Sequence, residues 1–216
     1  MFKTEKYYVL KHCPKVKSIL EIGFGDGNLS YNLAKKYPAV HITAIDGDKE
    51  YYALANKINS HKRIIYVCSN FENFKSKNVF DVIIASEVIE HLSNIDAFMK
   101  FISKHSHKGT ILILTSDNAH YLGFLLESFK SMFIKKFNLY IWRNQAGKYY
   151  SWNKHYYNWT INTLGTILHM YNFTPFQYYY SQHGFVKGIL NFLLDFVSFF
   201  VPFFRRKIVI FGIQKK

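Results

Sequence analysis

The chain has 216 residues, of which 49% are hydrophobic and 19% charged, so it is long and apolar enough to bury a sizeable core within one large domain. This composition excludes a largely disordered protein, and the 11 glycines and 4 prolines are too few for a collagen-like or other fibrous chain. The 28 basic residues outnumber the 14 acidic ones, and the excess is concentrated in residues 97–216, which carry a net charge of +12 against +2 for residues 1–96.

Short apolar runs alternate with helical stretches along most of the chain. The apolar runs predict strands at Ser18–Ile22, Val40–Ile45, Ile64–Cys68, Phe80–Ala85 and Thr110–Thr115, and two later ones at Phe176–Ser181 and Ile208–Ile213. Helices are predicted at Asn28–Tyr37, which ends before Pro38, at Tyr51–Asn59 and at about 96–105. This alternation implies a mainly parallel sheet that is covered by helices on both faces.

Two segments interrupt the alternation, at about 118–158 and 185–206. The chain contains no internal repeat, low-complexity tract or linker rich in Pro, Gly and Ser. The sequence therefore predicts a single domain over residues 1–216, with these two segments as insertions.

A glycine cluster, residues 21–27 (EIGFGDG), follows the first predicted strand and leads into a helix. Glycine lets the backbone turn sharply and approach a ligand closely, and a helix N-terminus offers unpaired N–H groups. The spacing is G-x-G-x-G with Asn28 next, whereas a dinucleotide fingerprint requires G-x-G-x-x-G, so a pyrophosphate grip is disfavoured. Asp46, at the end of the second predicted strand, is placed to accept hydrogen bonds from both hydroxyls of a ribose. An ordinary glycine turn beside a strand-end Asp is the structural alternative.

These segments resemble the class I S-adenosylmethionine-dependent methyltransferases. EIGFGDG is similar to the first motif of that family, Ile45-Asp46 to its second, and FDVIIASEVIEHL (residues 80–92) to its fourth-strand motif. The resemblance covers about residues 15–116 and implies an α/β, Rossmann-like, seven-stranded sheet. This sheet would be mostly parallel, with helices on both faces and an antiparallel last strand reached by a hairpin.

The same resemblance implies a site for S-adenosylmethionine. Residues of the glycine cluster, the second strand end and the following turns would bind it: Glu21, Gly23, Gly25, Gly27, Asp46, Asn70, Phe71 and Ser86. Within this set, Asp46 would bind the ribose, and Asn70 with Phe71 would flank the adenine. Many family members have Asp at position 70, but Asn also accepts a hydrogen bond from the adenine amine.

The candidates for catalysis are Glu87, Glu90 and His91, which form an E-x-x-E-H pattern after the fourth predicted strand. On an α-helix, positions i, i+3 and i+4 share one face, so the three side chains are expected to converge. Such a set suits Mg²⁺ or Mn²⁺, which would lower the pKa of an acceptor hydroxyl. The pattern resembles two metal-assisted branches of the family, the ubiquinone-biosynthesis O-methyltransferases and the small-RNA 2′-O-methyltransferases, and His155 is a possible further ligand. The alternatives are His91 as a base without metal, or a helix start with no catalytic role.

The two insertions are the expected acceptor side. Residues 118–158 combine aromatic and basic side chains that are able to stack on bases or sugars and hold phosphate, or that simply fasten the insertion to the sheet. Residues 185–206 have polar residues at roughly helical spacing and a wide apolar face. That face predicts a cap over an apolar acceptor, a dimer face, an interfacial helix whose Arg205, Arg206 and Lys207 contact lipid phosphates, or ordinary packing.

Three functions are consistent with these observations. The first is O-methylation of a small-molecule, sugar or lipid-linked acceptor, the second is metal-assisted 2′-O-methylation of RNA, and the third is a non-catalytic cofactor-binding or membrane-surface protein. The apolar run of a signal peptide is missing at the N-terminus, and the 2 cysteines, Cys13 and Cys68, suggest buried thiols in a reducing compartment. The expected location is therefore cytoplasmic, with possible peripheral contact to a membrane through residues 185–207.

Overall fold

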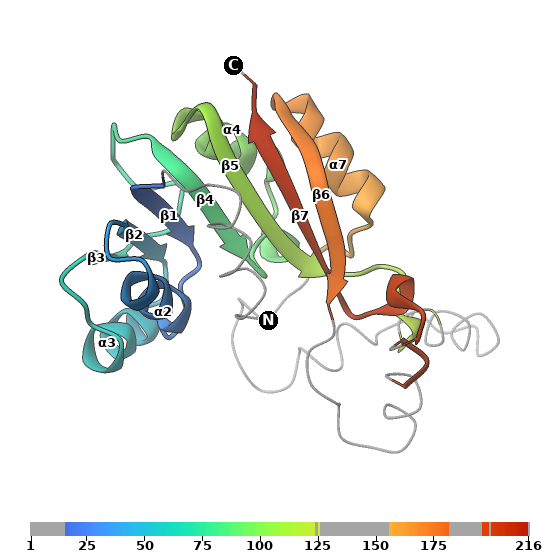
Figure 1. The fold of residues 1–216 in the computed structure, drawn as a ribbon, viewed down its shortest axis with the longest axis horizontal. Coiled ribbons are helices and arrows are strands. Elements are labelled where there is room, and N and C mark those ends of the chain that lie inside the picture. Colours follow the sequence, from blue (N-terminus) through green and yellow to red (C-terminus); the bar gives the residue numbers. More distant parts are fainter. Residues whose placement is uncertain (1–15, 124, 126–155, 182–195, 199, 216) are drawn as a thin grey trace.

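The computed structural model describes residues 16–123, 125, 156–181, 196–198 and 200–215 (Figure 1). The strands are β1 (Ser18–Ile22), β2 (His41–Asp46), β3 (Ile64–Cys68), β4 (Phe80–Ser86), β5 (Ser106–Asp117), β6 (Phe173–Ser181) and β7 (Lys207–Gln214). The helices are α2 (Asn28–Lys36), α3 (Lys49–Ile58), α4 (Ile95–Lys104) and α7 (Ile161–Met170), with 3₁₀ turns η1 (Ile89–His91) and η3 (Pro202–Phe204). Each strand and helix expected from the sequence is present, and the α/β fold class is confirmed.

The strands form one seven-stranded sheet in the order β3-β2-β1-β4-β5-β7-β6. β1 to β5 run parallel, and β7 lies antiparallel between β5 and β6. Ile22 at the end of β1 is opposite both Ile45 of β2 and Ala85 of β4. The turns that follow these three strands therefore meet at one edge of the sheet, which is where ligands bind in folds of this kind.

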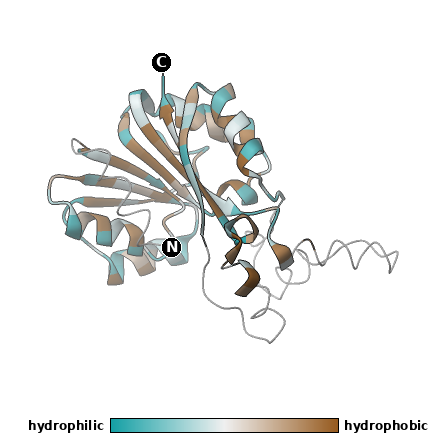
Figure 2. Cartoon of the chain, turned by 45° about the vertical axis from the view of Figure 1, so that its right-hand side comes forward, coloured by the Kyte–Doolittle hydropathy of each residue, from teal (hydrophilic) through white to brown (hydrophobic). Residues whose placement is uncertain are grey.

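Both faces of the sheet are apolar. Alternate side chains of each strand point to opposite sides of the sheet, and the apolar strands therefore supply hydrophobic residues to each side. On one side, strand residues such as Leu20, Ile83 and Leu112 pack in a cluster with residues of α4 and α7. On the other side, their neighbours such as Ile19 and Ile113 pack with residues of α2 and α3. Figure 2 shows the result as strands that carry most of the hydrophobic colour between more hydrophilic helices.

The sequence did not predict α7. Its ten residues, INTLGTILHM, include four β-branched side chains among Ile and Thr and the central Gly165, which give weak intrinsic helix propensity. The helix is stabilised instead by a capping box between Thr160 and Thr163 and by burial of Leu164 and Leu168 against the sheet. Tertiary packing thus outweighs local propensity here.

The expectation that Cys68 is buried was wrong. Cys68 is a free, exposed cysteine at the end of β3, which is an edge strand of the sheet. An edge strand has no neighbour on one side, so its side chains are less covered than those of a central strand. Cys13 lies outside the described residues.

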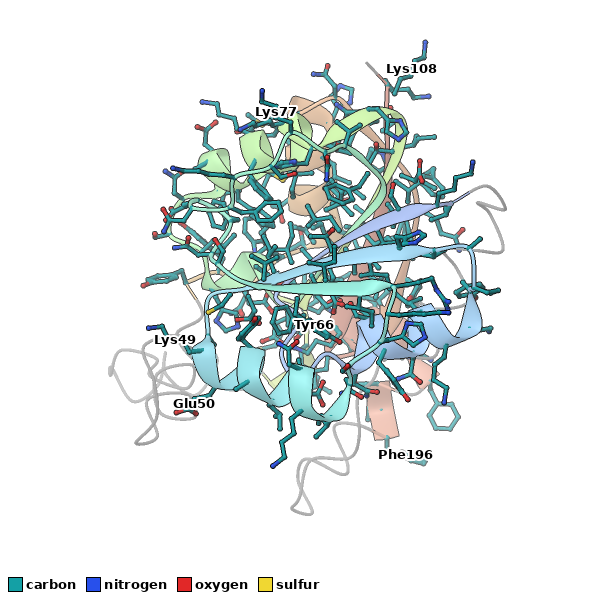
Figure 3. All side chains as sticks on the ribbon, turned by 90° about the vertical axis from the view of Figure 1, so that its left-hand side faces the viewer. Lys49, Glu50, Tyr66, Lys77, Lys108 and Phe196 are labelled. Carbon is teal, nitrogen blue, oxygen red and sulfur yellow. The ribbon has the colours of Figure 1, made fainter. Side chains whose placement is uncertain are left out.

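Gly27 is the N-cap residue of α2. It has φ of 76°, and a Cβ there would lie 2.5 Å from the Tyr66 hydroxyl and 2.9 Å from the Ala55 Cβ. The Tyr66 hydroxyl also donates to the Gly27 carbonyl at 3.2 Å, and Figure 3 shows Tyr66 between β3 and α3. Gly27 therefore allows the glycine cluster, β3 and α3 to approach each other closely.

We expect Gly27→Ala to lower the stability by roughly 2–4 kcal/mol, because it combines backbone strain with overlap against Tyr66 and Ala55. For a domain of this size the melting temperature is then expected to fall by about 5–15 °C, measured by calorimetry. Gly109→Ala is the matched control: its φ is 94°, and its added Cβ meets nothing within 4 Å. Equal melting temperatures for the two variants would contradict the steric part of the argument.

Candidate functional site

A cavity of about 870 Å³ lies at the edge of the sheet where β1 to β4 end, within the range of about 300–1,000 Å³ usual for small-molecule sites. Its wall combines the glycine cluster, the end of β2, the turn after β3 and the segment after β4. The lining residues are Ile22, Gly23, Gly25, Asp26, Ile45, Asp46, Gly47, Asp48, Tyr51, Ser69, Asn70, Phe71, Glu72, Ser86, Glu87, Val88, His91, Leu92, Ser93 and Asn94. Most of the residues predicted for cofactor binding are thus brought together.

Gly23 and Gly25 form the floor of this cavity, both with positive φ, of 74° and 53°. The Gly23 N–H donates to the Ile45 carbonyl at 2.8 Å, which ties the loop to β2. A Cβ on Gly23 would lie 2.5 Å from a Val88 methyl carbon, whereas a Cβ on Gly25 would meet no protein atom within 4 Å. The backbone at Gly25 therefore faces open space, as a loop that cradles a ligand must.

Asp46 connects the glycine loop to the start of α3. Its Oδ2 accepts from the Gly25 N–H at 3.0 Å, and its Oδ1 accepts from the Asp48 N–H at 3.0 Å. Burial raises the pKa of Asp46 above its ordinary value of 3.8, and these two backbone hydrogen bonds oppose the rise. The carboxylate is thus held in a fixed orientation at the cavity wall, with lone pairs left for further donors.

Asn70 and Phe71 line the cavity from the turn after β3, and Asn70 lies close to Gly47, which directly follows β2. The Asn70 Oδ1 accepts from the Asn73 N–H at 3.1 Å, which fixes this turn. The Phe71 ring packs edge-on against Phe98 of α4, with 5.3 Å between the ring centroids, and it lines the cavity with its remaining surface. An aromatic face and an amide side by side suit a flat heterocycle with polar edges.

Two of the predicted cofactor residues, Glu21 and Gly27, do not line the cavity. Glu21 lies on β1 with its side chain toward α2, is only 2% exposed, and accepts a hydrogen bond from the Ser30 hydroxyl. The alternation of side chains along β1 explains this orientation. Both residues stabilise the glycine cluster without lining the cavity. Glu21 binds Ser30 of α2, and Gly27 accepts a hydrogen bond from the Tyr66 hydroxyl.

The expected convergence of Glu87, Glu90 and His91 on one helical face was wrong. The helical segment is a 3₁₀ turn of only three residues, Ile89–His91, and Glu87 precedes it with φ of 58°. Glu87 and His91 line the cavity, whereas Glu90 is fully buried beside it, with its backbone carbonyl accepting from the Tyr156 N–H at 2.7 Å. A 3₁₀ turn places side chains at intervals of three rather than 3.6 residues, so the α-helical spacing rule does not apply.

The described part of the chain contains no group of three His, Cys, Asp or Glu side chains arranged to hold a metal ion. The fourth predicted ligand, His155, lies outside the described residues. A metal site that includes His155 therefore stays a prediction.

Sequence reasoning did not assign the structural partner of Glu87. The Lys207 ammonium, at the start of β7, forms ion pairs with the carboxylates of Glu87 and of Asp117, the latter at 2.5 Å. Thr115 donates its hydroxyl to Glu87 at 3.1 Å. Burial lowers the pKa of Lys207 to about 8. The one signal in the sequence was a lysine immediately before an apolar strand, which is too common to indicate an ion pair.

In one of the interpretations of residues 185–206, Arg205, Arg206 and Lys207 contact lipid phosphates; the structure gives each of them a partner within the chain, and contact with a membrane stays a prediction. Arg205 donates to the Tyr180 carbonyl at 3.1 Å, Arg206 lies over the Tyr121 ring, and Lys207 is paired as above. In the stretches of chain that the structure covers, no helix has the length and apolar character needed to span a bilayer. The aromatic segment 126–155 and residues 182–195 of the two insertions lie outside those stretches.

This strand order, with a glycine-floored cavity at the carboxyl edge, defines a Rossmann-like methyltransferase fold. A family model described as a methyltransferase domain matches residues 4–178. The chain therefore belongs to the class I S-adenosylmethionine-dependent methyltransferase family, as the sequence motifs predicted.

The curated relatives match part of the chain. A malonyl-[acyl-carrier protein] O-methyltransferase from Bacillus cereus is 29% identical over 98 residues, 45% of this chain and 36% of the relative. A ubiquinone biosynthesis O-methyltransferase from Rickettsia akari is 29% identical over 125 residues, 55% of this chain and 49% of the relative. The chain thus spans between a third and a half of the length of these relatives.

Solved methyltransferase structures align with all or nearly all of this chain. The plantazolicin methyltransferase BpumL, in complex with a triazolic desmethylPZN analogue and S-adenosylhomocysteine (SAH), has a TM-score of 0.65 at 17% identity and matches 100% of this chain and 84% of its own. The magnesium protoporphyrin IX methyltransferase of Synechocystis with bound SAH has a TM-score of 0.65 at 12% identity and matches 99% of this chain and 82% of its own. At these identities the likeness concerns the fold.

Proposed function

We propose that this protein transfers the methyl group of S-adenosylmethionine to an oxygen of a small-molecule, sugar, or lipid- or carrier-linked acceptor. The observation that carries the proposal is the Asp46 carboxylate, held by the Gly25 and Asp48 amides at the wall of the cavity. The curated relatives named above, which are called O-methyltransferases, support oxygen as the methylated atom.

The cofactor fits the residues that line the cavity. Asp46 would accept hydrogen bonds from the ribose hydroxyls, and Asn70 with Phe71 would bind the adenine. Gly23 and Gly25 leave room for the methionine end, since the Cβ of a larger residue at Gly25 would project into the open space. When bound, S-adenosylmethionine supplies a methyl group on a positively charged sulfur, which makes the group ready for transfer.

The protein then has to align and deprotonate the acceptor hydroxyl. Alignment is a large share of such catalysis, because it removes the entropy cost of bringing the reactants together. His91 lines the same cavity as Gly23 and Gly25, on the segment that follows β4, and is the candidate base that takes up the hydroxyl proton. Glu87, beside it in the wall, is a candidate hydrogen-bond acceptor for that hydroxyl.

The test is binding of SAH followed by turnover. We expect SAH to raise the melting temperature, because a ligand at 100 times its dissociation constant adds about 2.7 kcal/mol to the free energy of unfolding. Mass spectrometry of candidate acceptors incubated with S-adenosylmethionine is expected to detect a gain of one methyl group. Absence of any SAH-induced shift would contradict the cofactor assignment, and binding without methylation of any acceptor would favour a non-catalytic cofactor-binding protein.

RNA 2′-O-methylation remains a separate hypothesis, since it depends on aromatic and basic residues of the segment 118–158, most of which lies outside the described residues. Binding of short RNA with a strong salt dependence would favour it, because each neutralised phosphate releases counterions. The small-acceptor proposal predicts that salt has little effect on acceptor affinity.

A further inference from the structure

Three elements bring one lysine and two acids together beside the cavity. Glu87 directly follows β4, Asp117 is the last residue of β5, and Lys207 is the first residue of β7. The strand register creates this group, because Ser86 is opposite Thr115 and Asp117 is opposite Lys207. The group therefore belongs to the same sheet edge as the proposed cofactor site.

All three charged side chains are substantially buried. The side chains of Lys207 and Asp117 are 12% and 6% exposed, and that of Glu87 is 26% exposed. Of the three, only Glu87 lines the cavity. Lys207 itself does not line the cavity, but it forms an ion pair with Glu87, which does.

Glu87 also has a backbone conformation that needs support. Its φ of 58° lies in the left-handed region, which residues with a Cβ rarely adopt unless their surroundings enforce it. The Glu87 N–H donates to the Thr115 carbonyl at 3.1 Å, and the Glu87 carboxylate is bound by the Thr115 hydroxyl and the Lys207 ammonium. These contacts fix both the backbone and the side chain of Glu87.

We propose that Lys207 is an internal cation of the acceptor side, which holds Glu87 in the cavity wall and, by pairing with both Glu87 and Asp117, makes Glu87 unavailable to a divalent metal ion. Lys207 is on this account a positioning residue that acts through Glu87. Because the ammonium already satisfies both carboxylates, Mg²⁺ would have to displace a buried charge to bind them. The catalytic consequence rests on the proposed function, whereas the exclusion of metal from Glu87 does not.

The main variant is Lys207→Met, with Lys215→Met as the matched control, since Lys215 is exposed just beyond β7. We expect the first variant to lower the melting temperature by roughly 5–15 °C, because it leaves two buried carboxylates without their cation. Millimolar Mg²⁺ or Mn²⁺ should then raise the melting temperature of Lys207→Met but not of the wild type or the control. Adding Asp117→Asn should abolish this response.

With an acceptor proven for the wild type, we expect Lys207→Met to reduce kcat at least about tenfold, with little change in the KM for S-adenosylmethionine, because the altered contact lies on the acceptor side. The reduction should disappear when Lys207→Met is introduced into a Glu87→Gln background, as for two residues that act as one unit. An unchanged kcat in Lys207→Met would overturn the positioning role.

The wild type provides a test that does not require the variant to fold. Electron paramagnetic resonance with Mn²⁺ is expected to show no bound ion that depends on Glu87. A bound Mn²⁺ signal that is lost in Glu87→Gln would overturn the inference. Titration of the wild type with SAH separates this outcome from failure of the proposed function, because lack of SAH binding leaves the metal measurement intact.

Discussion

Replacing Asp46 with alanine is expected to weaken SAH binding by roughly 100-fold or more, because hydrogen bonds to a charged group contribute about 1.5–3 kcal/mol each and the ribose would lose two of them. The same change removes the acceptor for the Gly25 and Asp48 amides, so the loop under the methionine end also loses its anchor. Isothermal titration calorimetry measures the loss directly. Wild-type affinity in Asp46→Ala would show that Asp46 does not bind the ribose.

Glu50→Gln is the matched control for the charge. Glu50 is exposed near the start of α3 (Figure 3). It is not among the residues that line the cavity, so the variant should bind SAH as tightly as the wild type does. Circular dichroism of Asp46→Ala separates lost binding from lost folding. An equal loss of affinity in both variants would indicate a long-range charge effect instead of a ribose contact.

The pH dependence of SAH affinity follows from the burial of Asp46. The ionised carboxylate accepts hydrogen bonds from both ribose hydroxyls, whereas a protonated one is a weaker acceptor. Since burial raises the pKa of Asp46 above 3.8, affinity should begin to fall at a higher pH than an exposed aspartate would give. Calorimetric titrations over mildly acidic pH, with the fold monitored in parallel, measure the shift.

The sheet was predictable because its signals are local. Apolar runs such as Ser18–Ile22 correspond to strands with the same limits, since a central strand that is buried on both faces is mostly apolar. The cavity floor was predictable for a similar reason, because Gly23 and Gly25 follow a strand and adopt the positive φ values that glycine permits. Asp46 was found from its place at the next strand end.

The acceptor side was less predictable, because its contacts join residues distant in sequence. Glu87 and Lys207 are 120 positions apart, and they meet only because β7 inserts between β5 and β6. The E-x-x-E-H pattern gave a wrong prediction of an α-helix for a related reason. Whether such a short segment forms an α-helix or a 3₁₀ turn depends on packing as well as on the spacing of its residues. The burial of Glu90 has no signal in the local sequence.

His91→Gln is expected to reduce kcat by about 10²–10⁴-fold, the usual contribution of a general base. Glutamine keeps a polar side chain of similar reach but cannot take up the hydroxyl proton at neutral pH. SAH affinity should change little, because the proton is transferred on the acceptor side of the cavity. Steady-state kinetics with a proven acceptor, together with calorimetry, distinguish the two effects.

The pH profile makes this assignment specific to proton transfer. The wild-type rate is expected to rise with pH as the base loses its proton, and this limb should disappear in His91→Gln. His169→Gln, an exposed position on α7 away from the cavity, should keep both the rate and the profile. If His91→Gln retains the wild-type rate and profile, alignment of the acceptor by the cavity would account for catalysis without a protein base, as is feasible for an acceptor that already carries an ionised oxygen.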